Sequence, residues 1–126
     1  MIWGGKNGSK FYSDIHMYNT LTNIWEEVDI KSIINPTGVE GACMEVYNDD
    51  MYIFGGKNEF RSNKYLWKFN LGSNEYTLLS TLNYNSPTEV SYSTCYAIGH
   101  NLYIMYGVLD DTTSPRAIHI FDLETH

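Results

Sequence analysis

Residues 51–76, MYIFGGKNEFRSNKYLWKFNLGSNEY, contain an arrangement that the remainder of the chain repeats. An apolar segment ends in Gly55-Gly56, a polar loop follows, and an aromatic segment then ends at Phe69. Short apolar runs separated by Gly, Asn, Asp and Ser predict β-strands joined by turns. No window of about 11 residues or more shows an apolar period of 3.6 residues, so we predict no helix and an all-β fold.

The same pattern recurs at a fixed spacing. Residues 2–7, IWGGKN, return as residues 53–58, IFGGKN, at an offset of 51 positions. Residues 36–37 return as residues 87–88 at the same offset, and a third copy keeps Gly107 as the counterpart of Gly56. Self-similarity at a period of this length is the signature of a tandem array such as a solenoid or a propeller.

Each copy predicts up to four strands in one order, which we name a to d. We expect strand a at 42–47 and 93–98, strand b at 51–54 and 102–106, strand c at 15–18, 66–69 and 118–121, and strand d at 25–28 and 76–79. Four strands in this order, joined by short turns, form the antiparallel blade of a propeller. Strands b and c are apolar at most positions instead of alternating, which indicates sheets covered on both faces.

The spacing of glycines and aromatic residues resembles the kelch-repeat signature. A double glycine is followed by an aromatic residue 13 positions after its second glycine, and by another aromatic seven positions later. These structural positions are Gly4, Gly5, Tyr18 and Trp25, then Gly55, Gly56, Phe69 and Tyr76, and finally Gly107 and Phe121, with Tyr106 replacing a glycine. The resemblance implies kelch-type β-propeller blades. Glycines permit close backbone approach, and the aromatic pair supplies rigid area to the gap between blades.

The repeat length predicts an incomplete propeller over residues 1–126. We expect the end of one blade at 1–30, a complete blade at 41–80 and the start of a third at 92–126. Propellers close with roughly four to eight blades. We therefore expect the remaining blades to come from a longer chain, which we favour, or from self-association.

Charge and hydropathy argue against two classes of partner. The chain carries 8 Lys+Arg against 15 Asp+Glu, a net charge of −7, and an acidic chain repels nucleic-acid phosphates. Residues 1–4 lack the features of a signal peptide, and no apolar segment has membrane-spanning length. We expect a cytoplasmic chain without nucleic-acid or membrane partners.

The two cysteines do not predict a disulfide. Alignment of the repeats places Cys43 opposite Thr94 and Cys95 opposite Met44, one residue out of register. Such an offset points the two side chains to opposite sheet faces. We therefore expect two small buried residues in a reducing compartment.

No residue pattern predicts a cofactor, metal or catalytic site. His16 and His119 both align with Trp67, which predicts packing of a flat ring and not metal ligation. No His-x-His or Cys-x-x-Cys spacing is present. A Gly-x-Ser-x-Gly nucleophile is absent, and residues 4–9 lack the spacing of a phosphate-binding loop.

The long connections are the strongest candidates for function. The b–c loops at 6–14, 57–64 and 108–116 and the d–a loops at 30–40 and 80–90 should share one propeller face, where functional variation collects. Partners commonly bind there in kelch proteins, so we expect a non-catalytic module that binds another protein. The expected binding residues are Lys10, Phe11, Lys57, Phe60, Arg61, Tyr84 and Arg116.

Two alternatives remain open. Some kelch propellers resemble sugar oxidases or sialic-acid epimerases, and blades outside these residues could carry such a carbohydrate site. The chain could also be the substrate-recognition part of a ubiquitin-ligase adaptor. That role requires a BTB or F-box domain, which these 126 residues do not contain.

Overall fold

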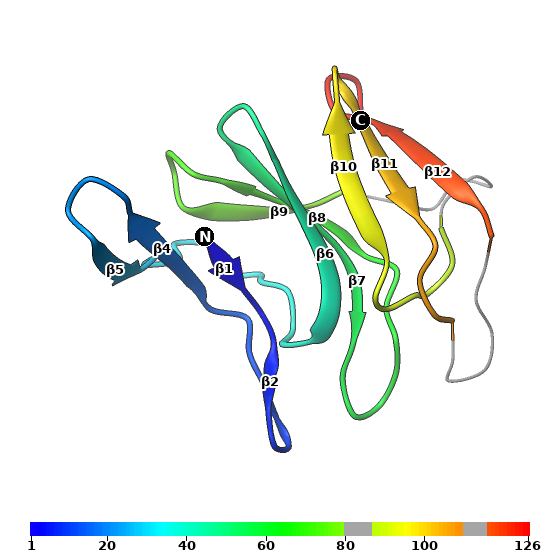
Figure 1. The fold of residues 1–126 in the computed structure, drawn as a ribbon, viewed down its shortest axis with the longest axis horizontal. Helices are drawn as coiled ribbons and strands as arrows, with labels where there is room; N and C mark the ends of the chain where they lie inside the picture. Colours follow the sequence, from blue (N-terminus) through cyan, green and yellow to red (C-terminus); the bar gives the residue numbers. More distant parts are fainter. Residues whose placement is uncertain (80–86, 110–115) are drawn as a thin grey trace.

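A computed structural model describes residues 1–79, 87–109 and 116–126 of the chain. These residues form 12 β-strands and no helix, and hence no helix that could cross a bilayer. Ten of the strands make three antiparallel sheets that lie side by side in an arc (Figure 1). The predicted all-β, blade-like architecture is confirmed.

The strands follow the predicted order a to d. Blade 1 contains β1 (Ile2–Trp3), β4 (Ile15–Asn19) and β5 (Ile24–Glu27). Blade 2 contains β6 (Glu40–Tyr47), β7 (Asp50–Lys57), β8 (Leu66–Asn70) and β9 (Glu75–Leu79). Blade 3 contains β10 (Thr94–Ile98), β11 (Asn101–Met105) and β12 (Ile118–Asp122). Within each blade, every strand pairs in antiparallel fashion with the next strand in the a-to-d order.

A small hairpin in the first b–c loop was not predicted. It pairs β2 (Lys6–Asn7) with β3 (Lys10–Phe11) around Gly8, whose φ is +60°. The two-residue loop is Gly8-Ser9, and a glycine at the first loop position suits a tight hairpin turn. The strands carry almost no apolar pattern, so periodicity alone could not reveal them.

The core fills the two gaps between blades. Between blades 1 and 2, Ile15 packs with residues of blade 2: Met51, Ile53, Trp67, Phe69 and Tyr76. Between blades 2 and 3, the opposite face of blade 2 packs against blade 3, and this cluster includes Tyr52, Phe54, Leu66, Leu102 and Ile104. Blade 2 is therefore covered on both faces, as its apolar strands predicted. Burying each large side chain contributes roughly 1.5–3 kcal/mol.

The kelch aromatic pair of a blade faces the preceding blade. In blade 2 the ring centroids of Phe69 and Tyr76 lie 4.7 Å apart, and both side chains are buried against blade 1. In blade 1 the equivalent Tyr18 and Trp25 rings are 5.1 Å apart, but Trp25 is 53% exposed. The first pair thus lies on an outer face that no described residue covers.

The paired glycines admit a neighbouring backbone, as expected. A Cβ atom at Gly55 would lie 2.5 Å from the carbonyl oxygen of Val90, and the φ of Gly55 is +72°. The next residue, Gly56, donates its N–H to the same oxygen at 2.9 Å. One repeat earlier, Gly5 donates to the carbonyl of Val39 at the same distance, 2.9 Å. The glycines therefore position Val39 and Val90, near the points where the d–a connections reach the next strand a.

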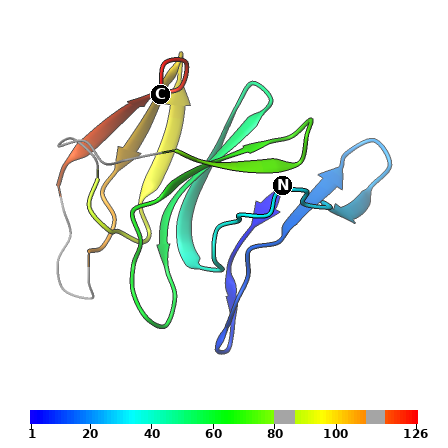
Figure 2. The ribbon, with the colours of Figure 1, turned by 180° about the vertical axis from the view of Figure 1, so that it is seen from behind.

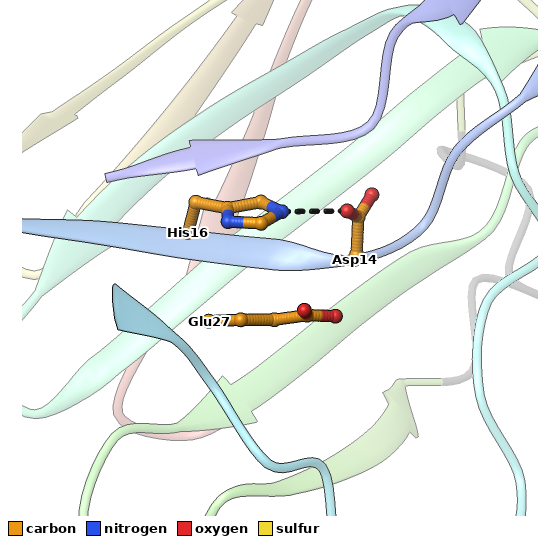
Figure 3. Close-up of side chains that lie close together, drawn as sticks. All are labelled: Asp14, His16 and Glu27. Atoms are coloured by element: carbon orange, nitrogen blue, oxygen red, sulfur yellow. Dashed lines mark hydrogen bonds and ion pairs between the residues drawn. The ribbon is translucent and has the colours of Figure 1, made fainter. Parts of the chain in front are cut away.

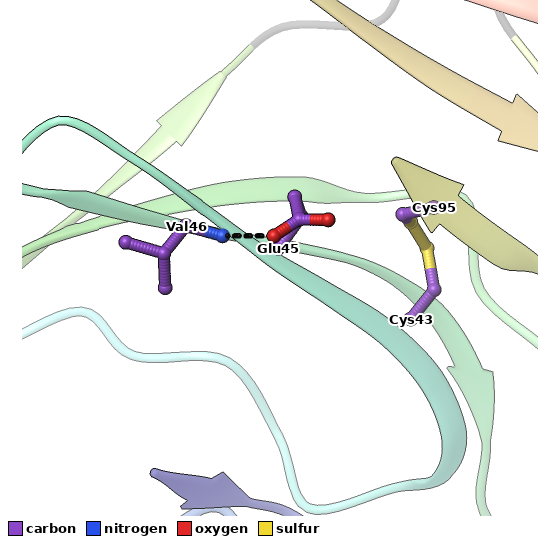
Figure 4. Close-up of a disulfide and its surroundings, with 4 residues drawn as sticks. All are labelled: Cys43, Glu45, Val46 and Cys95. Atoms are coloured by element: carbon purple, nitrogen blue, oxygen red, sulfur yellow. Dashed lines mark hydrogen bonds between the residues drawn. A yellow bond between two sulfur atoms is a disulfide. The ribbon is translucent and has the colours of Figure 1, made fainter. Parts of the chain in front are cut away.

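The cysteines form a disulfide, so the prediction of two unpaired cysteines was wrong. Cys43 of β6 is bonded to Cys95 of β10, with 5.6 Å between their Cα atoms (Figure 4). Both are buried, as predicted. Because of the one-residue offset, Cys43 and Cys95 lie on opposite faces of their blades. Cys43 lies on the face of blade 2 that packs against blade 3, and Cys95 lies on the face of blade 3 that packs against blade 2. The offset therefore permits the bond.

The c–d turns repeat one hydrogen-bonding device. Asn19, Asn70 and Asp122 each accept the N–H groups of the residues two and three positions later through a side-chain oxygen. In the third turn these bonds, from Thr125 and Glu124, lower the pKa of Asp122. Such Asx turns fix tight connections locally.

Candidate functional site

The β2–β3 hairpin, the β7–β8 loop and the segment that leads into β6 lie at one edge of the blades, which we name the loop edge (Figure 1). In Figures 1 and 2 the β2–β3 hairpin and the β7–β8 loop project from the lower edge of the view. The tight β6–β7 and β10–β11 turns lie at the upper edge. Antiparallel order dictates this separation, because strands a and c run away from the loop edge and strands b and d return to it.

One polar cluster on the loop edge links blades 1 and 2 with the segment entering blade 3. The Nζ atom of Lys6 lies 3.2 Å from Oε1 of Glu40. The Nζ atom of Lys57 lies 5.3 Å from the ring centroid of Tyr92, a cation–π distance. Partial burial acts to raise the pKa of Glu40, but hydrogen bonds from Lys6 and Tyr92 and the charges of both lysines hold it below its usual value.

Cations also lie over aromatic rings on the β2–β3 hairpin. Lys6 Nζ is 5.5 Å from the centroid of Phe11, and Lys10 Nζ is 5.0 Å from that of Tyr12. Each exposed contact of this kind contributes about 0.5–1 kcal/mol. The contacts favour defined side-chain positions on an otherwise polar hairpin.

The β7–β8 loop presents an aromatic residue beside a cation. Asn58 Oδ1 accepts the N–H groups of Phe60 at 3.0 Å and of Arg61 at 3.2 Å. The Asn58 N–H donates in turn to the carbonyl of Arg61 at 3.1 Å. The backbone of the tip is therefore tied, while the Phe60 side chain remains 82% exposed.

The structure places most of the predicted binding residues on the loop edge. Lys10 and Phe11 lie on the blade 1 hairpin, and Lys57, Phe60 and Arg61 on blade 2. Arg116 is exposed just before β12, whereas Tyr84 lies outside the described residues. Partner binding by these residues stays a prediction.

Sequence reasoning missed three members of the polar cluster: Lys6, Glu40 and Tyr92. Glu40 and Tyr92 are far apart in sequence, and only the meeting of two blades brings them together. One signal was present, because Gly41 occupies the position equivalent to Tyr92 one repeat earlier. An aromatic residue in place of a repeat glycine marks a local departure, and Tyr92 does adopt a φ of +56°.

Two cavities lie in the gaps between the described parts of the blades. A cavity of about 90 Å³ between blades 1 and 2 is lined in part by Trp3, Ile53 and Trp67. Its counterpart between blades 2 and 3 measures about 10 Å³ and is lined in part by Ile104, Tyr106 and His119. His119, which aligns with Trp67 in the repeat, thus lies in the gap between blades 2 and 3. Neither lining offers a paired acid and base.

The comparisons with known proteins agree with this architecture. The family described as the KLHDC2/KLHL20/DRC7 Kelch-repeats domain matches residues 1–126. The chain is 26% identical to Kelch domain-containing protein 10 of Bos taurus and of Homo sapiens, over 100% of its own length and 30% of theirs. It is 30% identical to the Xenopus laevis protein of that name, over 97% of this chain and 30% of the relative. The chain spans about a third of the length of these relatives, and it belongs to the Kelch-repeat family.

Proposed function

We propose that the chain is a non-catalytic module that binds another protein through its loop edge. The observation that carries the proposal is Phe60, which is 82% exposed beside Arg61 on a hydrogen-bonded turn. Aromatic and arginine side chains dominate the binding energy of protein interfaces. A side chain on a tied backbone loses less conformational entropy when a partner orders it.

The charge distribution supports the same edge. The chain is acidic overall, yet six of its 8 Lys+Arg residues fall within the three b–c loops: Lys6, Lys10, Lys57, Arg61, Lys64 and Arg116. Basic side chains in an acidic molecule favour an oriented approach by an acidic surface. We therefore propose a partner that presents carboxylates around an apolar pocket able to accept Phe60.

The test compares two exposed apolar residues on opposite edges. Phe60→Ala, and separately Lys57→Glu with Arg61→Glu, should weaken partner capture from lysate about 30-fold or more, the effect of losing a contact worth about 2 kcal/mol. Leu21→Ala is the matched control, because Leu21 is 92% exposed in a tight turn of the other edge. Changes at Asn48 and Asp49 serve the same purpose for polar residues.

Quantitative mass spectrometry of the captured proteins gives the result. Equal capture by wild type and all loop-edge variants would contradict the proposal. Selective loss in the Leu21 or Asn48 variants would assign binding to the tight-turn edge instead.

A further inference from the structure

Three potential metal ligands converge on the outer face of blade 1. His16 lies in β4, Asp14 precedes it by two residues on the same face, and Glu27 is the cross-strand partner of His16 in β5 (Figure 3). Ile15, between them, points to the opposite face and is 0% exposed. Burial of Ile15 in the core thus fixes the direction of its two neighbours.

The functional atoms of the three side chains are close together. His16 Nε2 lies 2.6 Å from Asp14 Oδ2, a hydrogen bond or ion pair. One ligand atom from each of Asp14, His16 and Glu27 lies within 4.8 Å of the others. Figure 3 shows the Glu27 side chain extending alongside the histidine–aspartate pair. This geometry differs from the packing role that the alignment with Trp67 predicted for His16.

The cluster has no counterpart at the equivalent positions of blade 2. The equivalent positions in blade 2, one repeat of 51 residues later, are Tyr65, Trp67 and Leu78. Blade 2 therefore has two aromatic residues and a leucine at the three positions where blade 1 has potential metal ligands. The replacement brings two carboxylates, with their two negative charges, to one imidazole. A divalent cation would balance both.

We propose that Asp14, His16 and Glu27 form a binding site for a divalent first-row transition metal of the zinc type. One imidazole nitrogen and two carboxylate oxygens suit such an ion, whereas calcium and magnesium prefer oxygen ligands alone. Three protein ligands leave a fourth tetrahedral position for water or another donor.

Only small side-chain movements are needed for Asp14, His16 and Glu27 to bind a zinc ion together. Zinc lies about 2.0–2.2 Å from nitrogen and oxygen ligands, so tetrahedral ligand atoms are separated by about 3.3 Å. Nε2 of His16 and Oδ2 of Asp14 would separate slightly as the ion takes the place of the proton between them. Glu27 is exposed and can turn inward. The backbone register of β4 and β5 needs no change.

Zinc titration of the purified full chain tests the site, with affinity measured by calorimetry and by competition with a chromophoric chelator. His16→Gln and Glu27→Gln should each weaken zinc binding about 10-fold or more, since losing even an outer-shell partner of a metal ligand costs 10–100-fold. Glu26→Gln is the matched control. It removes the same charge one residue away, where the side chain points to the other face of β5.

Two measurements separate ligation from a structural role. Thermal melts without metal show whether each variant folds, and cobalt(II) absorption reports the ligand field directly. The proposal expects the cobalt spectrum to change in His16→Gln and Glu27→Gln but not in Glu26→Gln. The metal site would be ruled out if either His16→Gln or Glu27→Gln bound zinc as tightly as wild type does.

Discussion

The indole Nε1 of Trp3 donates a hydrogen bond of 2.9 Å to the phenol oxygen of Tyr76. Trp3 belongs to β1 of blade 1 and Tyr76 to β9 of blade 2, so the bond crosses the gap between blades. Burial raises the pKa of Tyr76 to about 12, although the bond from Trp3 acts in the other direction. The kelch aromatic therefore provides apolar area and also satisfies a polar group inside the gap.

Removing this acceptor should destabilise the pair of blades. Tyr76→Phe keeps the ring but leaves the Trp3 N–H without its partner, and we expect the free energy of unfolding to fall by about 1–2 kcal/mol. Denaturant unfolding followed by tryptophan fluorescence gives the value. Tyr96→Phe, at an exposed position of blade 3, is the control and should change stability by less than about 0.5 kcal/mol. Equal stability of Tyr76→Phe and wild type would show that the bond contributes nothing.

Alkaline pH should destabilise the folded chain more than it would if all of its tyrosines were exposed. Burial raises the pKa of both Tyr52 and Tyr76 to about 12, above the ordinary value of 10.0. Between these values the unfolded chain releases the phenol protons while the folded chain keeps them. Stability therefore falls as pH rises from about 10 to about 12.

Melting temperatures measured across that range test the sign of this effect. The slope should be smaller in Tyr76→Phe, which lacks one of the two groups. A melting temperature independent of pH over this window would contradict the buried, protonated state of both phenols.

The sequence predicted the repeating elements well because they depend on local signals. Glycines, turn residues and apolar runs located the nine blade strands whose bounds were predicted to within a few residues. The β2–β3 hairpin was missed because Lys6, Asn7 and Lys10 carry no apolar period. Residues 7–9, Asn-Gly-Ser, are typical of a turn but do not predict the strands beside it.

Contacts between blades were harder to predict, because they depend on which faces meet. The offset of Cys43 and Cys95 was interpreted within a single sheet, where opposite faces exclude contact. Across two adjacent blades the same offset brings the side chains together. The alignment of His16 with Trp67 likewise described a position in the repeat, but it could not reveal Asp14 and Glu27 beside it.

Reduction of the disulfide should loosen blade 2 from blade 3. Cys43 and Cys95 are separated by 52 residues, and a crosslink closing a loop of this size typically stabilises a fold by about 2–4 kcal/mol. A reductant should therefore lower the melting temperature of wild type. The Cys43→Ala, Cys95→Ala double variant should melt at the lower temperature with or without reductant. Alkylation of both cysteines in native, unreduced protein would contradict the bond.

The first kelch glycine of blade 2 should tolerate no side chain. In Gly55→Ala the new Cβ would meet the Val90 carbonyl oxygen at 2.5 Å, and φ is +72°. Gly5→Ala shares the positive φ, at +98°, but has no atom within 4 Å of the new Cβ. We expect Gly55→Ala to cost at least about 1 kcal/mol more than Gly5→Ala, because only it adds a backbone clash to conformational strain. Equal losses in the two variants would show that φ alone sets the requirement.

The outer faces of blades 1 and 3 should make the isolated chain self-associate. On the outer face of blade 1, Tyr18 is 40% and Trp25 is 53% exposed beside the polar cluster of Asp14, His16 and Glu27. On the outer face of blade 3, Ile118 is 55% and Ile120 is 61% exposed. Apolar patches of this kind mark interaction or aggregation surfaces. Because the two faces differ, contact between them is head to tail and can close a ring or continue into larger assemblies. Size-exclusion chromatography with light scattering should show species larger than the 14.5 kDa monomer. Trp25→Glu combined with Ile120→Lys should shift the chain toward the monomer, whereas Leu21→Lys at an exposed turn should not. A monodisperse, cooperatively melting wild-type monomer would mean that these faces are stable in water, and the apolar area on blades 1 and 3 would then need no covering blade.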